Sequence, residues 1–204
     1  MVLAIRDVRR HDLDAVLALN NAAHGGISPM DGTQLKQFYE IADYFRVAEI
    51  DGHLAGFLIA LRENADHDGE NFIWFRQRYE RFAYIDRIVV ANAYRRHGLG
   101  RVFYSDVQSY AEPRVPMLTC AVVLEPRDDV AVLFHGTYGF NEVGQQMVGP
   151  DRHVGLLSKN LDSHAFVRGH YGSEEQLPDV PWLRRRLPEA AHRDTPAMTG
   201  SHCA

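Results

Sequence analysis

The most informative part of this sequence is Tyr84-Ile85-Asp86-Arg87-Ile88-Val89-Val90, followed after four residues by Arg95-Arg96-His97-Gly98-Leu99-Gly100. The first run is apolar apart from its Asp-Arg pair, and it predicts a buried strand. Beyond the second run, apolar residues recur at helical spacing: Leu99, Val102, Phe103, Val107 and Tyr110. The two runs therefore predict a strand, a short turn and the start of a helix.

The start of this helix is suited to an anion. The first N–H groups of a helix have no partner within it, and its dipole is positive at this end. Gly98 and Gly100 would let phosphate oxygens approach the backbone without meeting a Cβ atom. Arg95 and Arg96 add full charges and forked donors. We therefore expect a phosphorylated ligand here.

Two common phosphate-binding motifs do not fit. The sequence has no P-loop run of Gly-x-x-x-x-Gly-Lys-Ser/Thr, and Gly98-x-Gly100 is followed by Phe103 where the dinucleotide fingerprint needs a third glycine. Residues 90–100 instead resemble motif A of the GNAT family of acyl-CoA-dependent N-acetyltransferases. That motif reads Arg/Gln-x-x-Gly-x-Gly/Ala after a strand ending in Val-x-Pro-x-Tyr-Arg, and here Asn92 replaces the proline.

A second stretch resembles motif B of the same family, Asn-x-x-Ala-x-x-Phe-Tyr-x-x-x-Gly-Phe. It follows the apolar run 118–124, which predicts one buried strand. Ala131 and Gly139-Phe140 match the motif, whereas Asp128 stands in place of asparagine and His135 in place of tyrosine. Asp128 or Asp129 is expected to cap the intervening short helix, and Gly139 to end it in a left-handed conformation.

The resemblance implies an α/β (α+β) fold with a mixed, mostly antiparallel central sheet, flanking helices and splayed central strands. It implies acetyl-CoA (coenzyme A) as cofactor and acetyl transfer to a primary amine of a small molecule or peptide, by direct attack in a ternary complex. The pyrophosphate would lie on the helix start, the pantetheine arm in the gap between the splayed strands, and main-chain N–H groups of the motif A strand would stabilise the oxyanion. The implied cofactor-binding residues are Ile88, Val89, Val90, Arg95, Arg96, His97, Gly98, Leu99, Gly100, Arg101, Asp128 and Phe134.

The chemistry also requires a base and an acid. Asp86 is the first candidate base, because it interrupts an apolar strand; a structural ion pair with Arg46 or Arg62 is the alternative, and Arg87 is expected to point to the opposite face. Glu125, at the end of the next strand, is the second candidate base. His135 occupies the position of the family's tyrosine and is the candidate acid. Alternatively, His135 only packs, and Tyr138, Tyr104 or water donates the proton.

Candidate acceptor-binding residues lie before the motif A strand. The connection 62–81 mixes acids with aromatic residues, and it predicts a short helix near 72–79 that packs on the sheet or forms a wall of the acceptor pocket. The candidate residues are Asn20, Ser28, Trp74 and Tyr79.

The remaining sequence predicts a strand at 2–7, a helix capped by Asp12, a second helix at 31–43, and a hairpin whose turn is Asp51-Gly52. A final strand pair is expected at 140–146 and 153–160. Residues 1–162 would form the acetyltransferase domain. Residues 163–204, rich in proline and weakly periodic, would form an appendage that wraps the domain or a partner in its first half and is disordered by its end.

The composition sets limits on the function. A net charge of −5 argues against general binding of nucleic acid or membrane surfaces, and two cysteines without metal-ligand spacing fit a reducing cytoplasm and no metal site. The absence of a signal sequence or a long apolar run also favours the cytoplasm. We expect an enzyme that is a monomer or homodimer. A non-catalytic acyl-CoA-binding sensor or interaction module on the same fold is the alternative.

Overall fold

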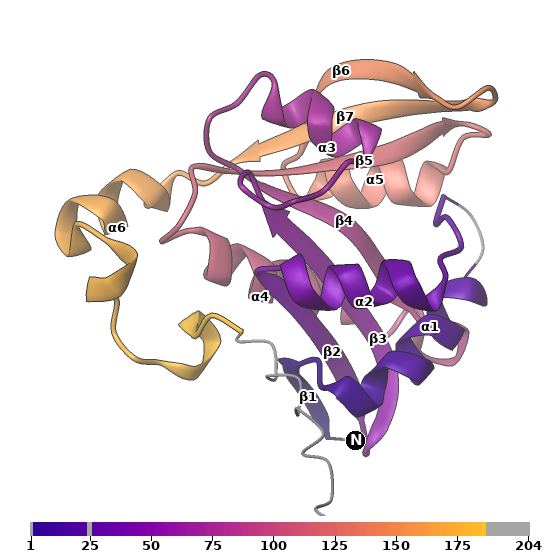
Figure 1. Cartoon of the computed structure of the whole chain (residues 1–204), viewed down its shortest axis with the longest axis horizontal. Coiled ribbons are helices and arrows are strands. Elements are labelled where there is room, and N and C mark those ends of the chain that lie inside the picture. Colours follow the sequence, from indigo (N-terminus) through magenta and orange to yellow (C-terminus); the bar gives the residue numbers. More distant parts are fainter. Residues whose placement is uncertain (1, 24–25, 187–204) are drawn as a thin grey trace, which may run out of the picture.

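The computed structural model describes residues 2–23 and 26–186, and a seven-stranded sheet forms its centre (Figure 1). The strand order is β1-β2-β3-β4-β5-β7-β6, and every neighbouring pair is antiparallel except β4 and β5. This confirms the predicted mixed, mostly antiparallel sheet. The strands are β1 (Leu3–Asp7), β2 (Tyr44–Ile50), β3 (His53–Arg62), β4 (Ala83–Val90), β5 (Met117–Glu125), β6 (Asn141–Val148) and β7 (Arg152–Asn160).

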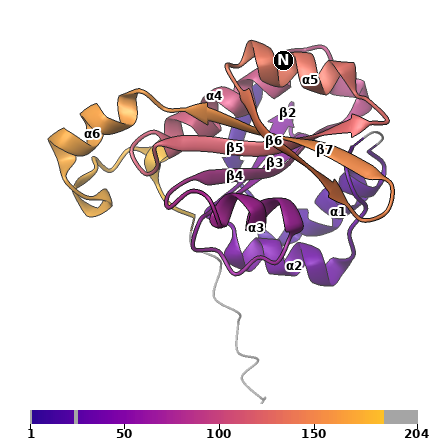
Figure 2. The same cartoon turned by 90° about the horizontal axis from the view of Figure 1, so that it is seen from above.

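Helices cover both faces of the sheet (Figure 2). They are α1 (Leu13–Asn21), α2 (Gly32–Ile41), α3 (Glu70–Arg76), α4 (Leu99–Ala111), α5 (Asp129–Thr137) and α6 (Ser163–Tyr171). One core cluster joins α4 and α5 to the sheet, and Phe103 and Tyr104 are among its fully buried side chains. The other joins α1, α2 and α3 to the opposite face, through Phe45, Phe57 and Phe72 among others. The sheet therefore separates two faces that can bind different ligands.

Several predicted turns and caps are confirmed. Asp51 and Gly52 both have positive φ, 49° and 81°, as a two-residue hairpin turn between β2 and β3 requires. The Asp128 carboxylate accepts a hydrogen bond from Ala131 N–H (3.0 Å) at the start of α5, and Gly139 after its end has φ 80°.

The predicted role of Asp12 was wrong. Its side chain makes no capping bond to α1, and instead it accepts hydrogen bonds from Arg9 N–H (2.7 Å) and from the guanidinium of Arg6. The pKa of the Asp12 carboxyl is lowered because these donors outweigh the opposing effect of burial. A single turn of 3₁₀ helix, η1 (Arg10–Asp12), precedes α1, so Asp12 holds the N-cap position while its carboxylate bonds back to the start of this turn.

The two central parallel strands separate along their length. β4 and β5 pair only through Ala83–Ile85 and Leu118–Cys120, so the remaining residues of β4 face no partner strand on that side. A bulge adds to the distortion: Ile59 of β3 lies opposite Arg87, and its neighbour Ala60 lies opposite Ile85. Asp86 is the extra residue. The predicted splay of the central strands is thus present, and Asp86 lies where it begins.

The connection before β4 contains a helix, as predicted, but α3 begins and ends a few residues earlier than expected. Phe72 and Phe75 are buried and contact Phe82 and Tyr84, with ring centroids 5.6–6.1 Å apart. The aromatic side chains of this connection therefore pack on the sheet, as the simpler of the two interpretations predicted.

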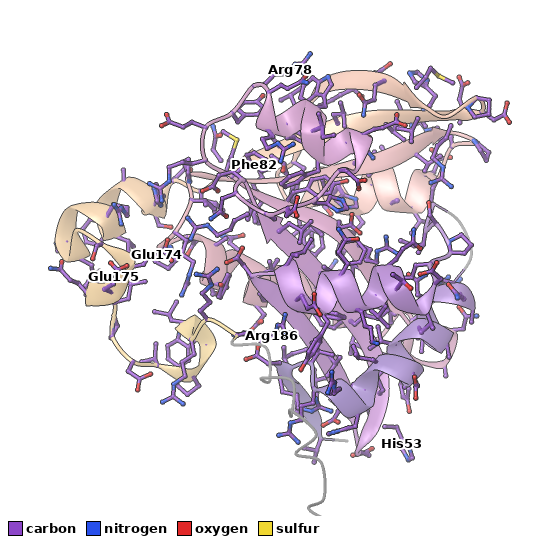
Figure 3. The ribbon with its side chains drawn as sticks, in the orientation of Figure 1. His53, Arg78, Phe82, Glu174, Glu175 and Arg186 are labelled. Carbon is purple, nitrogen blue, oxygen red and sulfur yellow. The ribbon has the colours of Figure 1, made fainter. Side chains whose placement is uncertain are left out.

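The chain beyond residue 162 forms a helix that the sequence analysis missed, α6, and then returns along the domain (Figure 1). Trp182 O accepts a hydrogen bond from Arg46 Nη2 (3.2 Å), Arg185 pairs with Asp43 (2.8 Å), and Arg186 is buried against the carbonyls of Tyr39 and Ala42. Glu174 and Arg186, labelled in Figure 3, belong to this returning stretch. The domain boundary at 162 stays a prediction, and the expected disorder falls on residues outside the described ones.

No helix within the described residues is long and apolar enough to cross a membrane.

Candidate active site

The start of α4 offers free main-chain donors. Val102 N–H donates to Gly98 O (3.1 Å), which is the first helical bond, so the N–H groups of residues 99–101 have no acceptor within the helix. Gly98 has φ 84°, and a Cβ atom built on it would meet no other atom within 4 Å. The space outside this turn is therefore open, and a negatively charged group can reach the main chain there.

Basic side chains surround this turn. Arg95, Arg96, His97 and Arg101 are all exposed. Arg95 Nε donates to Val90 O (3.3 Å), and the His97 ring bonds to Arg95 O through Nδ1 (2.8 Å), so these two residues hold the loop together. Arg96 adopts a left-handed backbone conformation (φ 67°) and, within the described part of the chain, forms no ion pair. The loop therefore presents net positive charge to solvent.

Helix α5 closes one side of this turn. A Cβ atom on Gly100 would lie 3.2 Å from the Phe134 ring, so the two residues touch only because position 100 is glycine. Asp128, which caps α5, is half-buried. The structure thus brings Gly100 and Phe134 together, whereas Asp128 is fixed at the far end of α5.

The free edge of β4 continues from this turn. Ala91 N–H donates to Ala55 O (2.9 Å) beside β3, and N–H groups alternate in direction along a strand. Val89 N–H therefore also points to β3, whereas the N–H groups of Ile88 and Val90 point into the gap beside β5. Of Ile88, Val89 and Val90, whose main-chain N–H groups were predicted to stabilise the oxyanion, the first and the last can donate to a group in the gap.

Asp86 forms an ion pair with its sequence neighbour. Asp86 Oδ2 lies 2.7 Å from Arg87 Nε, so the expectation that the two side chains point to opposite faces was wrong. Because Asp86 is the extra residue of the bulge, the normal alternation is interrupted there. The alternative partners were also wrong, because Arg46 pairs with Asp7 and Asp106, and Arg62 with Glu63 and Glu174.

Two further residues complete this cluster. Arg87 Nη1 donates to the side-chain oxygen of buried Asn20 (3.0 Å), and Asn20 in turn donates to Ser28 O (3.2 Å). On the other side of Asp86, its Oδ1 lies 3.7 Å from His67 Nε2. Asp86 is therefore held between a guanidinium and an imidazole, with 11% of its side chain exposed.

Asp86 and Arg87 line two cavities on the face covered by α1 and α2. The smaller, about 120 Å³, is bounded by the connection between α1 and α2, by β4 and β5, and by Arg152 and Val154 of β7. The larger, about 260 Å³, is lined by Met30, Gln34, Gln37, Phe38 and His67, together with Ser28, Pro29, Asp68 and Gly69. The Asp86 carboxylate is thus accessible from both.

Of the four predicted acceptor-binding residues, Ser28 lines both cavities and Asn20 holds Arg87 beside them. Trp74 and Tyr79 line neither of these two cavities. Trp74 packs against Gly144, where a Cβ atom would approach its ring to 2.5 Å, and Tyr79 packs on Phe75. Both side chains therefore pack within the protein, Trp74 on β6 and Tyr79 on α3.

The two other predicted catalytic residues lie in contrasting surroundings. Glu125 is 77% exposed at the end of β5, 3.9 Å from His153, and lines neither cavity. His135 is buried among aromatic rings, where Nδ1 bonds to Ala131 O (2.7 Å) and Nε2 to the Tyr104 hydroxyl (2.6 Å). Burial lowers the pKa of His135, so its ring is neutral at pH 7. This geometry favours the interpretation that His135 packs.

Sequence reasoning missed His67 and Arg152, and it placed Arg87 on the wrong face. His67 lies in the connection 62–81, whose acids and aromatic residues drew attention, and Arg152 is one residue before the expected last strand. Neither belongs to a motif. Only the fold brings His67 to Asp86 and Arg152 to the cavity that Asp86 lines, although the Asp-Arg pair within an apolar strand was a usable signal.

Comparison with known proteins agrees with this geometry. The profile described as "Acetyltransferase (GNAT) family" matches residues 13–140. Comparison with curated proteins finds no match.

Similar solved structures include the ribosomal-protein-S18-alanine N-acetyltransferase of Escherichia coli, with a TM-score of 0.62 and 18% identity over 78% of this chain and 94% of that one. NAA60 of Arabidopsis thaliana, solved with acetyl-CoA, has a TM-score of 0.62 and 16% identity over 78% of this chain and 99% of that one. The spermidine/spermine N-acetyltransferase SpeG of Vibrio cholerae has a TM-score of 0.57 and 20% identity over 81% of this chain and 98% of that one. At these identities the structures establish a shared fold.

Proposed function

Because this chain belongs to the GNAT acetyltransferase family, we propose that it is an acetyl-CoA-dependent N-acetyltransferase acting on a primary amine of a small molecule or peptide. The observation that supports this most strongly is the arrangement around β4. Its free edge lies beside the start of α4, where three main-chain N–H groups are free, and the Asp86 carboxylate faces cavities on the opposite side of the sheet. Acetyl-CoA and the acceptor amine would thus reach the same gap from opposite faces of the sheet.

The residues at the start of α4 fit coenzyme A. Open space outside Gly98, three free N–H groups and the exposed Arg95, Arg96 and Arg101 suit the pyrophosphate. The gap beside Ile88 and Val90 suits the pantetheine arm, and Phe134 closes the turn on one side. Bound there, the cofactor supplies the acetyl group as a thioester.

Main-chain donors in the gap would orient the acyl group. The N–H groups of Ile88 and Val90 are fixed by the pairing of β4 with β3, so they need no reorganisation to bind a carbonyl oxygen. Val89 is excluded from this role because its N–H points to β3. We therefore assign the N–H groups of Ile88 and Val90, two of the three predicted donors, to the carbonyl oxygen of the acyl group.

Asp86 is the proposed base. An alkylamine with a pKa near 10.4 is neutral in only about one molecule in a thousand at pH 7, so deprotonation adds roughly 4–5 kcal/mol to the barrier. A carboxylate held by Arg87 attracts the ammonium form and accepts its proton directly or through one water. Glu125 is less suited, because it lines neither cavity.

We propose that the proton for the leaving thiolate does not come from His135, the candidate acid of the sequence analysis. The N–H of neutral His135 is bonded to Ala131 O, and the Tyr104 hydroxyl is buried against His135, where burial raises the pKa of Tyr104. Of the alternatives considered, half-buried Tyr138 and water stay available. We propose Tyr138, because it follows α5 in contact with Phe134.

The proposed surroundings of the enzyme follow from composition. The chain carries a net charge of −5, which favours small-molecule or peptide acceptors over nucleic acid or membrane surfaces, and we propose a monomer or homodimer. Cys120 is buried in the core, where burial raises the pKa of its thiol, so it is unreactive. A reducing cytoplasm is the proposed compartment.

The direct test is a screen of amine acceptors with acetyl-CoA, following release of free thiol and identifying the product by mass spectrometry. We expect thiol release that depends on a specific amine and an N-acetylated product. Tight binding of acetyl-CoA without acetylation of any amine would instead support the acyl-CoA-binding module. The hydrogen bonds at both ring nitrogens of His135 favour this alternative, because they leave the ring no free proton to donate.

A further inference from the structure

The smaller cavity beside Asp86 has one unbalanced positive charge. Its lining contains Asp86, Arg87 and Arg152, and the first two pair with each other at 2.7 Å. Arg152 Nη1 donates to Ser28 Oγ (2.6 Å), and among residues 2–23 and 26–186 no carboxylate lies within 4.0 Å of its guanidinium. Since a guanidinium stays charged at any physiological pH, this wall favours an anion.

The surroundings strengthen this preference. Ala121, Val123 and Val154 supply apolar surface, Asn71 and Tyr84 add neutral polar groups, and no unpaired carboxylate in this lining offsets Arg152. The nearest acids along the chain do not enter the cavity: Asp151 is exposed, and Glu125 is exposed beside His153. Arg152 is thus a half-buried cation with a small cavity in front of it.

The larger cavity shares Ser28, Asp86 and Arg87 with the smaller one but has a different character. Met30 and Phe38 give it apolar surface, and Gln34 and Gln37 give it amide groups. This cavity suits a neutral side chain of moderate size. Asp86 is therefore shared by a cavity that contains the Arg152 cation and a cavity of mixed apolar and amide character.

We propose that the acceptor is a free α-amino acid with an apolar or amide side chain. Its carboxylate binds Arg152 and the Ser28 hydroxyl, its amine lies at Asp86, and its side chain enters the larger cavity. Arg152, Ser28 and Asp86 line the same small cavity, of about 120 Å³, so a carboxylate and an amine joined through a single carbon can occupy it together. This inference rests on the proposed acetyltransferase function and adds the substrate class. Amines without a carboxylate are predicted to be poor acceptors.

The test uses pairs of amines that differ only in the carboxylate: L-phenylalanine and 2-phenylethylamine, L-methionine and 3-(methylthio)propylamine, L-glutamine and 4-aminobutanamide. We expect kcat/KM to be at least tenfold higher for the amino acid of each pair. In Arg152→Gln this preference should fall at least tenfold, whereas Arg152→Lys should keep part of it. Arg10→Gln, which removes an exposed arginine outside both cavities, is the matched control and should keep all of it.

A second arm identifies the source of the carboxylate. Aspartyl-alanine amide is compared with asparaginyl-alanine amide, in which a neutral NH₂ group replaces the charged oxygen. A preference for the aspartyl peptide together with no turnover of free amino acids would overturn the proposed free amino acid, while keeping Arg152 as a carboxylate site.

A binding measurement separates this inference from the proposed function. L-phenylalanine and 2-phenylethylamine are titrated calorimetrically into the protein saturated with coenzyme A, and only the amino acid should bind, with its binding lost in Arg152→Gln. If no amine is acetylated, the proposed function fails, but this titration still decides the role of Arg152. Equal binding of both compounds, or a preference that survives in Arg152→Gln, would overturn the inference.

Discussion

The start of α4 and the cavity beside Asp86 are joined by β4, yet they are built in different ways. The first is made of main-chain N–H groups, two glycines and exposed arginines that are close together in the sequence. The second, the smaller cavity, is made of residues from the connection between α1 and α2, α3, β4, β5 and β7. The comparison teaches that a main-chain site can be recognised from a local motif, whereas a site of converging side chains depends on the fold.

The largest expected effect is at the main-chain site. Gly98→Asp places a carboxylate beside the proposed pyrophosphate, and this repulsion should weaken acetyl-CoA binding by about 2–3 kcal/mol, roughly 30- to 150-fold. Gly98→Asn is the matched control, because asparagine has nearly the same shape and both residues tolerate the positive φ of 84° at this position. Calorimetric titration of both variants measures the difference. Equal affinities would show that the phosphates lie elsewhere.

The next effect is at the side-chain site. Asp86→Asn should lower turnover at least tenfold, about 1.4 kcal/mol, while acetyl-CoA affinity stays within a few-fold, since Asp86 lies on the acceptor face. Glu125→Gln removes an exposed carboxylate that lines neither cavity, and its turnover should change little. Steady-state kinetics and calorimetry separate the two quantities. Unchanged turnover in a folded Asp86→Asn variant, with a loss in Glu125→Gln, would exchange their roles.

The same contrast explains what the sequence could predict. The motif A strand, the turn at Gly98 and the helix after it follow from apolar periodicity and glycine placement, so their expected and observed bounds nearly coincide. The bulge at Asp86 arises from the pairing of β3 with β4, which no local pattern encodes. For that reason the ion pair with Arg87 was missed, and neither His67 as a neighbour of Asp86 nor Arg152 as a residue of the same cavity was recognised.

The family resemblance carries less information at one position, residue 135. It gave His135 the role of the family's tyrosine, because alignment of a motif transfers a position and not its surroundings. In the fold, the Tyr104 hydroxyl and the Ala131 carbonyl occupy both ring nitrogens. Tyr104, the sixth residue of α4, was visible in the sequence, but its contact with His135 depends on how α4 and α5 pack.

A smaller effect concerns His135 and pH. Because burial lowers its pKa in the folded state, the unfolded chain binds a proton below about pH 6.5 that the folded chain does not, so the free energy of unfolding falls as the pH is lowered. The loss from this group is at most about 1.4 kcal/mol per pH unit, and it ends once the folded state is also protonated. His135→Gln should show a flatter dependence between pH 7.5 and 5 in urea unfolding. At pH 7.5 its turnover should fall only a few-fold, whereas a loss of a hundredfold or more would restore His135 as the acid.

The smallest effect on the site is expected from removal of the returning C-terminal stretch. Truncation after Asp162 removes the carbonyl partners of Arg46 and Arg114 and the carboxylate of Glu174 that pairs with Arg62, so the melting temperature should fall. These contacts are separate from the Gly98 turn and from both cavities, and acetyl-CoA affinity should therefore stay within about threefold. Truncation after Arg186 keeps all of these contacts and is the matched control. Calorimetry measures the affinity, and light scattering shows whether the stretch also affects assembly. A loss of binding in a folded Asp162 truncation that the Arg186 truncation does not share would mean that the stretch supports the cofactor site, and that the domain extends beyond residue 162.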